Sequence, residues 1–155
     1  MKKVFYLSAI IILSGFIFTA CEKENEDLTK PTIVINEPHE GEAIEPGEEL
    51  HFEADIADDT ELSSYKIDVH NASDGHTHSE AAGILKSIAH EGDTEEFSYL
   101  ETFTDAAGKK NHHIHQHIDI PENAEEGEYH LTIYVVDKTG NEAHVTRGFV
   151  IEHGE

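Results

Sequence analysis

The chain has a single cysteine, and it has no methionine after its first residue. A lone thiol cannot form an intrachain disulfide, so the fold must be stabilised by its core or by bound ions. Cu(I) prefers thiolate and thioether ligands, so their scarcity argues against Cu(I) handling. Basic residues are also few: 10 Lys and Arg stand against 33 Asp and Glu, for a formal charge of -23. So acidic a surface repels nucleic acid and concentrates cations, and we exclude nucleic-acid binding.

Several patterns that carry catalysis are missing as well. The sequence contains neither a G-x-S-x-G nucleophile elbow nor an H-E-x-x-H zinc motif. It also lacks an EF-hand-type calcium loop. We therefore predict that the protein is not an enzyme. Three classes of function stay open, in decreasing order of support: a metal-binding lipoprotein, a non-catalytic adhesion or interaction module, and a metalloenzyme.

Residues 1–20 are predicted to be a secretory signal. Two lysines precede an apolar run over residues 4–18, which is short for a transmembrane span. The four residues that end in Cys21 resemble the lipobox of bacterial lipoproteins, which implies cleavage before Cys21 and its acylation. We expect an outer-membrane lipoprotein, held at the periplasmic face or at the cell surface. Residues 21–30 would be a flexible acidic tether, which resembles a Bacteroidetes surface-export signal or is a plain spacer.

Residues 31–155 have the pattern of one all-β domain. Short segments alternate apolar and polar residues between turn signals, with almost no helical period. The Gly-x-Tyr at Tyr129 resembles the tyrosine corner of immunoglobulin-like domains, and residues 137–141 resemble their final hairpin turn. We predict an immunoglobulin-like antiparallel β-sandwich of about seven strands, with an insertion at about residues 71–92. The strands are expected near residues 32–36, 50–56, 62–70, 97–103, 112–120, 129–135 and 142–152.

Histidine is abundant, with 13 in the chain, and several fall in residues 112–121. Isoleucine recurs at alternate positions there and histidine between them, so one face of a strand can enter a core while the other presents imidazoles. His115 and His117 lie ~7 Å apart along a strand and can lean onto one ion, whereas His113 and His117, at ~13 Å, cannot. One H-x-H pair is thus the useful unit, and residues 76–78 supply another. The alternative is a solvated face without a ligand.

Topology is expected to gather histidines at one pole, because successive strands of a sandwich run up and down. One predicted strand ends at His70, its antiparallel partner begins near His130, and the histidine-rich strand ends at the same pole. We predict that these positions hold one or two ions. The candidate ligands are His70, His76, His78, His115, His117 and His130. His39 and His51 map to the same pole without being candidates, and Asp68, Asp74 and Asp119 are candidate partners that orient an imidazole.

Three segments, taken in order, carry a resemblance to a known family. Residues 67–78, 115–121 and 127–131 are similar to the Bacteroidetes lipoprotein family called Domain of Unknown Function 4625, and the similarity runs from about residue 30 to 153. The resemblance implies an immunoglobulin-like fold and an exterior location, and it points to the same six histidines. It assigns no activity.

The donor type decides the expected metal. Imidazole suits Zn²⁺, Cu²⁺, Ni²⁺ and Fe²⁺, and Zn²⁺ is our first expectation. We expect a lipid-anchored membrane protein that captures or buffers this divalent ion beside an outer-membrane uptake receptor. An adhesion module, stabilised by Ca²⁺, is the alternative function. That calcium would lie at the opposite pole, among carboxylates of Asp55, Asp58, Asp59 and Asp137.

Overall fold

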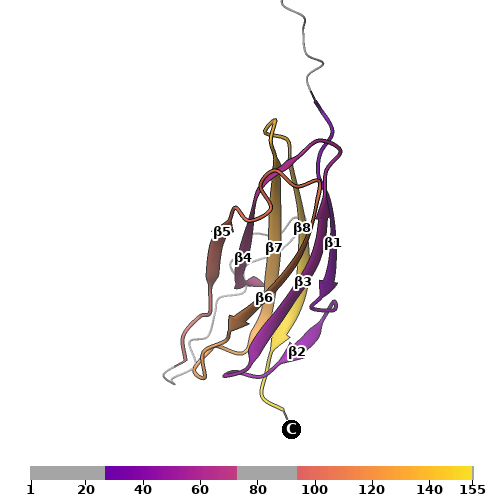
Figure 1. Cartoon of the computed structure of the whole chain (residues 1–155). Coiled ribbons are helices and arrows are strands. Elements are labelled where there is room, and N and C mark those ends of the chain that lie inside the picture. The colour runs from indigo at the N-terminus through magenta and orange to yellow at the C-terminus, as the bar shows by residue number, and fades with distance from the viewer. Residues whose placement is uncertain (1–26, 73–93, 155) are drawn as a thin grey trace, which may run out of the picture.

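The computed structural model describes residues 27–72 and 94–154, and there it confirms the immunoglobulin-like antiparallel β-sandwich (Figure 1). One sheet has three strands in the order β1-β3-β6, and the other has five in the order β2-β8-β7-β4-β5. The strands are β1 (Thr32–Glu37), β2 (Glu42–Ile44), β3 (Glu49–Ala57), β4 (Leu62–Asn71), β5 (Tyr99–Phe103), β6 (Asn111–Asp119), β7 (Gly127–Asp137) and β8 (Glu142–Ile151).

Three predictions lie outside the described residues. They are the signal peptide, the lipidated Cys21 with most of the tether, and the insertion that carries His76 and His78. In the described part of the chain, no helix is long and apolar enough to cross a membrane.

The short strand β2 was not predicted, because it lies in a segment that reads as turns. It pairs in parallel with β8, with Ile44 opposite Ile151. Three residues are too few to display a period of two, and the partner is more than 100 positions away in the sequence. Beside the expected strands, β2 therefore adds an eighth that extends the edge of the five-stranded sheet.

Alternating residues fill the core between the two sheets. On β3, Leu50, Phe52, Ala54 and Ile56 are each at most 1% exposed, and β4 and β7 contribute matching inward rows. Each large apolar side chain buried in this way contributes about 1.5–3 kcal/mol. Because the side-chain period of a strand is two, this inward row also fixes which residues of β3 face solvent.

Two turn features confirm the predicted immunoglobulin-like connections. The Tyr129 hydroxyl donates to the carbonyl of Glu125 at 2.8 Å, which is the tyrosine corner. In the β7–β8 turn the Asp137 carboxylate accepts from the backbone N–H groups of Thr139 and Asn141, each at 2.8 Å. Gly140 completes this turn with a φ of 95°, a conformation that favours glycine.

Candidate metal site

The outer face of the three-stranded sheet carries a ladder of imidazoles and carboxylates. β3 and β6 pair antiparallel, so their outward residues lie directly opposite one another. The four cross-strand pairs are Glu49–Asp119, His51–His117, Glu53–His115 and Asp55–His113. The inward neighbours on β6, Ile114 and Ile118, are 1% and 2% exposed, as the alternation predicted.

His115 and His117 form a pair suited to a tetrahedral ion. Their Nε2 atoms lie 3.1 Å apart and their ring centroids 4.9 Å apart. Two nitrogens bound to one tetrahedral Zn²⁺ at 2.0–2.1 Å are separated by about 3.3 Å. The spacing of the two nitrogens is therefore within a few tenths of an ångström of the spacing in a zinc site.

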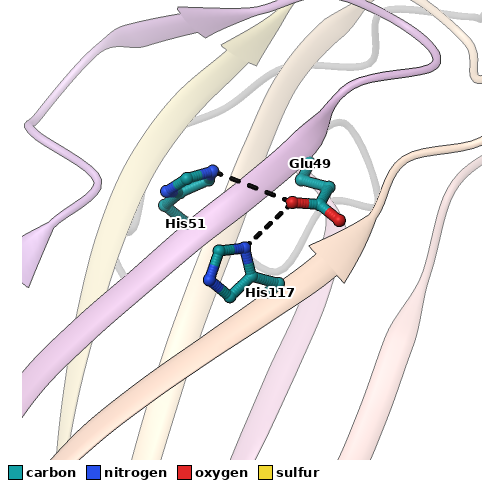
Figure 2. Close-up of side chains that lie close together, drawn as sticks. All are labelled: Glu49, His51 and His117. Carbon is teal, nitrogen blue, oxygen red and sulfur yellow. Dashed lines mark hydrogen bonds and ion pairs between the residues drawn. The ribbon is translucent and has the colours of Figure 1, made fainter.

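Glu49 fixes the orientation of the His117 ring (Figure 2). The Nδ1 of His117 lies 2.9 Å from the Oε2 of Glu49, and a carboxylate oxygen can only accept, so Nδ1 carries the proton. In the neutral ring the lone pair is then on Nε2, the atom that faces His115. This is the carboxylate–histidine arrangement that commonly supports zinc ligands.

His51 and His117 belong to a second possible set of ligands, together with Glu49. The ring centroid of His51 lies 4.5 Å from that of His117, and its Nε2 is 3.9 Å from Oε2 of Glu49. One ligand atom each from Glu49, His51 and His117 falls within 4.8 Å of the others. We call Glu49, His51, His115 and His117 the His face. Its side chains are between 44% and 54% exposed, so an ion bound there keeps positions open to water.

Farther along the ladder, the carboxylate of Asp55 is hydrogen-bonded to neighbouring side chains. It accepts from the side chain of Asn36 at 2.8 Å and lies 2.9 Å from Nδ1 of His113. The hydrogen bond from Asn36, followed by that from His113, holds the pKa of Asp55 below its ordinary value. Asp55 therefore remains a charged partner of His113 on the outer face of β3, at the same end of that strand as Asp58.

The structure separates the predicted ligands into two groups. His70 and His130 lie opposite each other on β4 and β7, with ring centroids 5.9 Å apart, and Asp68 is 3.1 Å from Nδ1 of His70. Both point away from a core that holds Val69 and Leu131, so they occupy the outer face of the five-stranded sheet.

His115 and His117 occupy the outer face of the other sheet. All four belong to the predicted pole, but the hydrophobic core lies between the two pairs and prevents them from sharing an ion. His76, His78 and Asp74 lie outside the described residues.

Two residues of the His face, Glu49 and His51, were missing from the predicted ligands. The outward row of β3 reads Glu49, His51, Glu53, Asp55, and this period of two is visible in the sequence. What the sequence does not display is that β3 pairs with β6 in the register that sets His51 against His117.

Fold and site together define an immunoglobulin-like sandwich with a histidine- and carboxylate-bearing sheet face. Within that class, the chain belongs to the family described as Domain of unknown function (DUF4625), whose profile matches residues 19–152. No curated protein matches the chain.

Solved structures with similarity to the chain come from several bacteria. The fibronectin(III)-like modules of CbhA from Clostridium thermocellum share 17% identity over 77% of this chain and 94% of theirs, with a TM-score of 0.43. A DUF4466 family protein from Parabacteroides merdae shares 16% identity over 79% of this chain and 44% of its own, with a TM-score of 0.48. The sporulation control protein Spo0M from Bacillus subtilis shares 12% identity over 81% and 49%, with a TM-score of 0.43.

Proposed function

We propose that the protein is a non-catalytic, lipid-anchored zinc-binding protein, in which His115 and His117 bind one Zn²⁺ through their Nε2 atoms. One observation carries the proposal: the two Nε2 atoms lie 3.1 Å apart while Glu49 holds the other nitrogen of His117 at 2.9 Å. A solvated row of histidines needs neither the converging nitrogens nor the orienting carboxylate.

The exposure of the His face favours capture or buffering of the ion over a structural role. Structural zinc sites are closed by four protein ligands, whereas this one offers two or three side chains that are about half exposed. The remaining positions are filled by water or by a ligand from a partner, so the ion can exchange. An acidic chain with a formal charge of -23 concentrates cations near the site.

Membrane attachment through Cys21 belongs to the same proposal. Acyl chains at about 0.8 kcal/mol per buried methylene would hold the domain at the outer membrane, next to an uptake receptor that accepts the ion. Cys21→Ser is expected to release the protein into the soluble fraction, and only the unmodified chain should carry acyl chains by mass spectrometry. Recovery of Cys21→Ser in membranes contradicts the anchor and leaves the zinc proposal intact.

Calorimetric titration of the full chain in mild detergent, after removal of metals with a chelator, tests the site. We expect one Zn²⁺ per chain at the His face and at least a hundredfold loss of affinity in the double variant His115→Ala/His117→Ala. The matched control is His70→Ala/His130→Ala, which removes a histidine pair from the other sheet and should change the affinity less than twofold. All four positions lie on outer faces, so circular dichroism should show both variants folded.

Unchanged zinc binding in His115→Ala/His117→Ala, or an equal loss in the control, contradicts the proposed site. Absence of stoichiometric zinc binding favours the adhesion or interaction module. That second function has support in Val34 and Leu100, which are 59% and 68% exposed on the edge strands β1 and β5. Exposed apolar residues on sheet edges are places where another chain can pair.

A further inference from the structure

Three aspartates meet at the pole opposite the His face. Asp27 precedes β1, Asp58 directly follows β3, and Asp137 ends β7. One carboxylate oxygen from each lies within 4.8 Å of the others. We call these residues the Asp cluster.

The cluster places negative charge in a buried setting without a basic partner. Asp137 is 2% exposed and Asp58 is 9% exposed. Among the ion pairs of residues 27–72 and 94–154, none involves a member of the cluster. Like charges brought this close repel, and burial raises the cost of each.

Hydrogen bonds stabilise the negative charge on Asp137. Burial acts to raise the pKa of Asp137, but donors from Asn141, Thr139 and Gly140 outweigh it and hold the pKa below the ordinary value. The Asn141 side-chain amide donates to Oδ2 of Asp137 at 2.7 Å, and the Asn141 and Thr139 backbone N–H groups donate to Oδ1. Asp137 is therefore a fixed anion at the centre of the turn.

The carboxylate of Asp58 is not satisfied in the same way. Its Oδ1 accepts from the backbone N–H of Thr60 at 2.9 Å and from the Thr60 hydroxyl at 2.7 Å. Its Oδ2 is enclosed and has no hydrogen-bond partner. A bound cation would compensate a buried carboxylate oxygen that has no donor and lies beside two further carboxylates.

We propose that Asp27, Asp58 and Asp137 bind one Ca²⁺ ion. The donors are all oxygen, which suits a hard cation, and Ca²⁺ bonds oxygens at 2.3–2.6 Å in a flexible geometry. Carboxylate oxygens within 4.8 Å of one another fit around such an ion, and waters complete its six to eight ligands. Mg²⁺ demands a stricter octahedron and gives up its waters reluctantly, so it suits a partly buried cluster less well.

The cluster differs from the carboxylates expected from sequence. Asp58 and Asp137 were among the expected residues, whereas Asp55 lies on the outer face of β3 beside His113. Asp59 is in the same turn but accepts from the Thr29 hydroxyl at 3.2 Å. Asp27 is the residue that the sequence did not indicate.

The ion would join three segments that are distant in the sequence. The Asp27 carbonyl already accepts from the Asn141 side chain at 3.0 Å, and its Oδ2 lies 3.0 Å from the Thr60 hydroxyl, whose one proton is shared with Oδ1 of Asp58. A cation between the carboxylates holds the residues before β1 against the β3–β4 and β7–β8 turns. Calcium would thereby fix the direction in which the chain arrives at the sandwich.

Calcium titration of the chelator-treated full chain in mild detergent tests this site. We expect one Ca²⁺ per chain, a rise of about 5 °C in melting temperature at saturation, and slower amide exchange at residues 27–30. Asp27→Asn keeps the shape of a partly exposed side chain, and it should lower calcium affinity at least tenfold. Asp59→Asn removes a charge from the same turn and should lower it less than threefold. His115→Ala/His117→Ala should leave it unchanged.

Three outcomes overturn the proposal. If 5 mM Ca²⁺ produces neither heat nor a shift in melting temperature, the cluster does not bind calcium. If Asp27→Asn and Asp59→Asn lose affinity equally, calcium is attracted by diffuse charge and has no site. An equal response to Mg²⁺ overturns the assignment to calcium. None of these results depends on zinc binding, so they leave the proposed function to its own test.

Discussion

The His face and the Asp cluster lie at the two ends of the same strand: Glu49 begins β3, and Asp58 is the first residue beyond its end. The His face is built from a regular ladder, so backbone spacing alone brings its ligands together, and every side chain stays about half exposed. The Asp cluster is built from turns and from the segment before β1, and two of its three carboxylates are buried. A sheet face can thus offer ligands at little energetic cost, whereas a buried cluster must be compensated.

The two regions should therefore differ in what they contribute to stability. Exposed pairs such as Glu49 and His117 contribute about 0–1 kcal/mol, because solvent screens them. Buried hydrogen bonds to a charged group contribute about 1.5–3 kcal/mol each. We expect the His face to matter for binding and hardly at all for folding, and the Asp cluster to matter for both.

Acidification is expected to produce the largest difference between the two sites. An imidazole must be neutral to bind a metal, and free imidazole takes up a proton near pH 6.5. Two such ligands together should weaken zinc binding several hundredfold, about 600-fold, between pH 7 and pH 5. Free carboxylates titrate near pH 4, so calcium binding to the Asp cluster should fall less than threefold over the same range. Calorimetry at pH 7, 6 and 5 with each ion measures both slopes.

A zinc affinity that changes by less than tenfold over this range would mean that imidazoles are not the ligands. A calcium affinity that falls as steeply as that of zinc would place histidine in the calcium site. The His115→Ala/His117→Ala variant is the control, since its residual zinc binding should lose the steep dependence on pH.

The sequence predicted which residues of a strand face the core better than it predicted which strands pair. The alternation in residues 112–120 predicted that Ile114 and Ile118 are buried and that His115 and His117 face solvent, and both hold in the structure. Alternation is local, since it follows from the two-residue period of one strand. The antiparallel pairing that brings the end of the strand at His70 beside the start of the strand at His130 was also predicted, from the usual pairing in this fold, and the structure sets the two residues opposite each other.

What the sequence could not provide was the distribution of ligands between the sheets. Two outward-facing pairs at one pole looked like one site, but outward means opposite directions on the two sheets of a sandwich. Glu49 reaches His117 only because β3 and β6 pair in one particular register across 68 residues of sequence. Asp27 was expected in a tether, and its contacts with Thr60 and Asn141 depend on turns that are far away in the chain.

The Asp137→Ala variant is expected to show the next largest effect. It tests whether the Asp cluster contributes more to stability than the His face does. Removing this carboxylate leaves the N–H donors of Thr139 and Asn141 without their acceptor, so we expect unfolding free energy to fall by about 2–3 kcal/mol at pH 7 in chelator. Glu49→Ala should change it by less than about 0.5 kcal/mol. Urea unfolding followed by circular dichroism measures both variants.

The sign of the pH dependence follows from the lowered pKa of Asp137. A carboxyl group with a folded pKa below its unfolded value of 3.8 stabilises the fold above that value and loses its contribution as the pH falls through the folded pKa. The difference between the native chain and Asp137→Ala should therefore be full at pH 5–7 and shrink below about pH 4. A difference that is independent of pH would show that the charge of Asp137 is not what stabilises the turn.

The smallest expected effect concerns Glu49→Gln, which asks whether Glu49 orients His117 or binds the ion itself. Glutamine can still accept a hydrogen bond from Nδ1 through its carbonyl oxygen but carries no charge, so an orienting role predicts about a tenfold loss of zinc affinity. If Glu49 is instead a ligand together with His51, then His51→Ala should weaken zinc binding at least as much as His115→Ala does. Calorimetry on these three single variants separates the two arrangements of the His face. A loss confined to Glu49→Gln and His115→Ala supports the pair of Nε2 ligands, and a loss confined to Glu49→Gln and His51→Ala transfers the site to Nδ1 of His117.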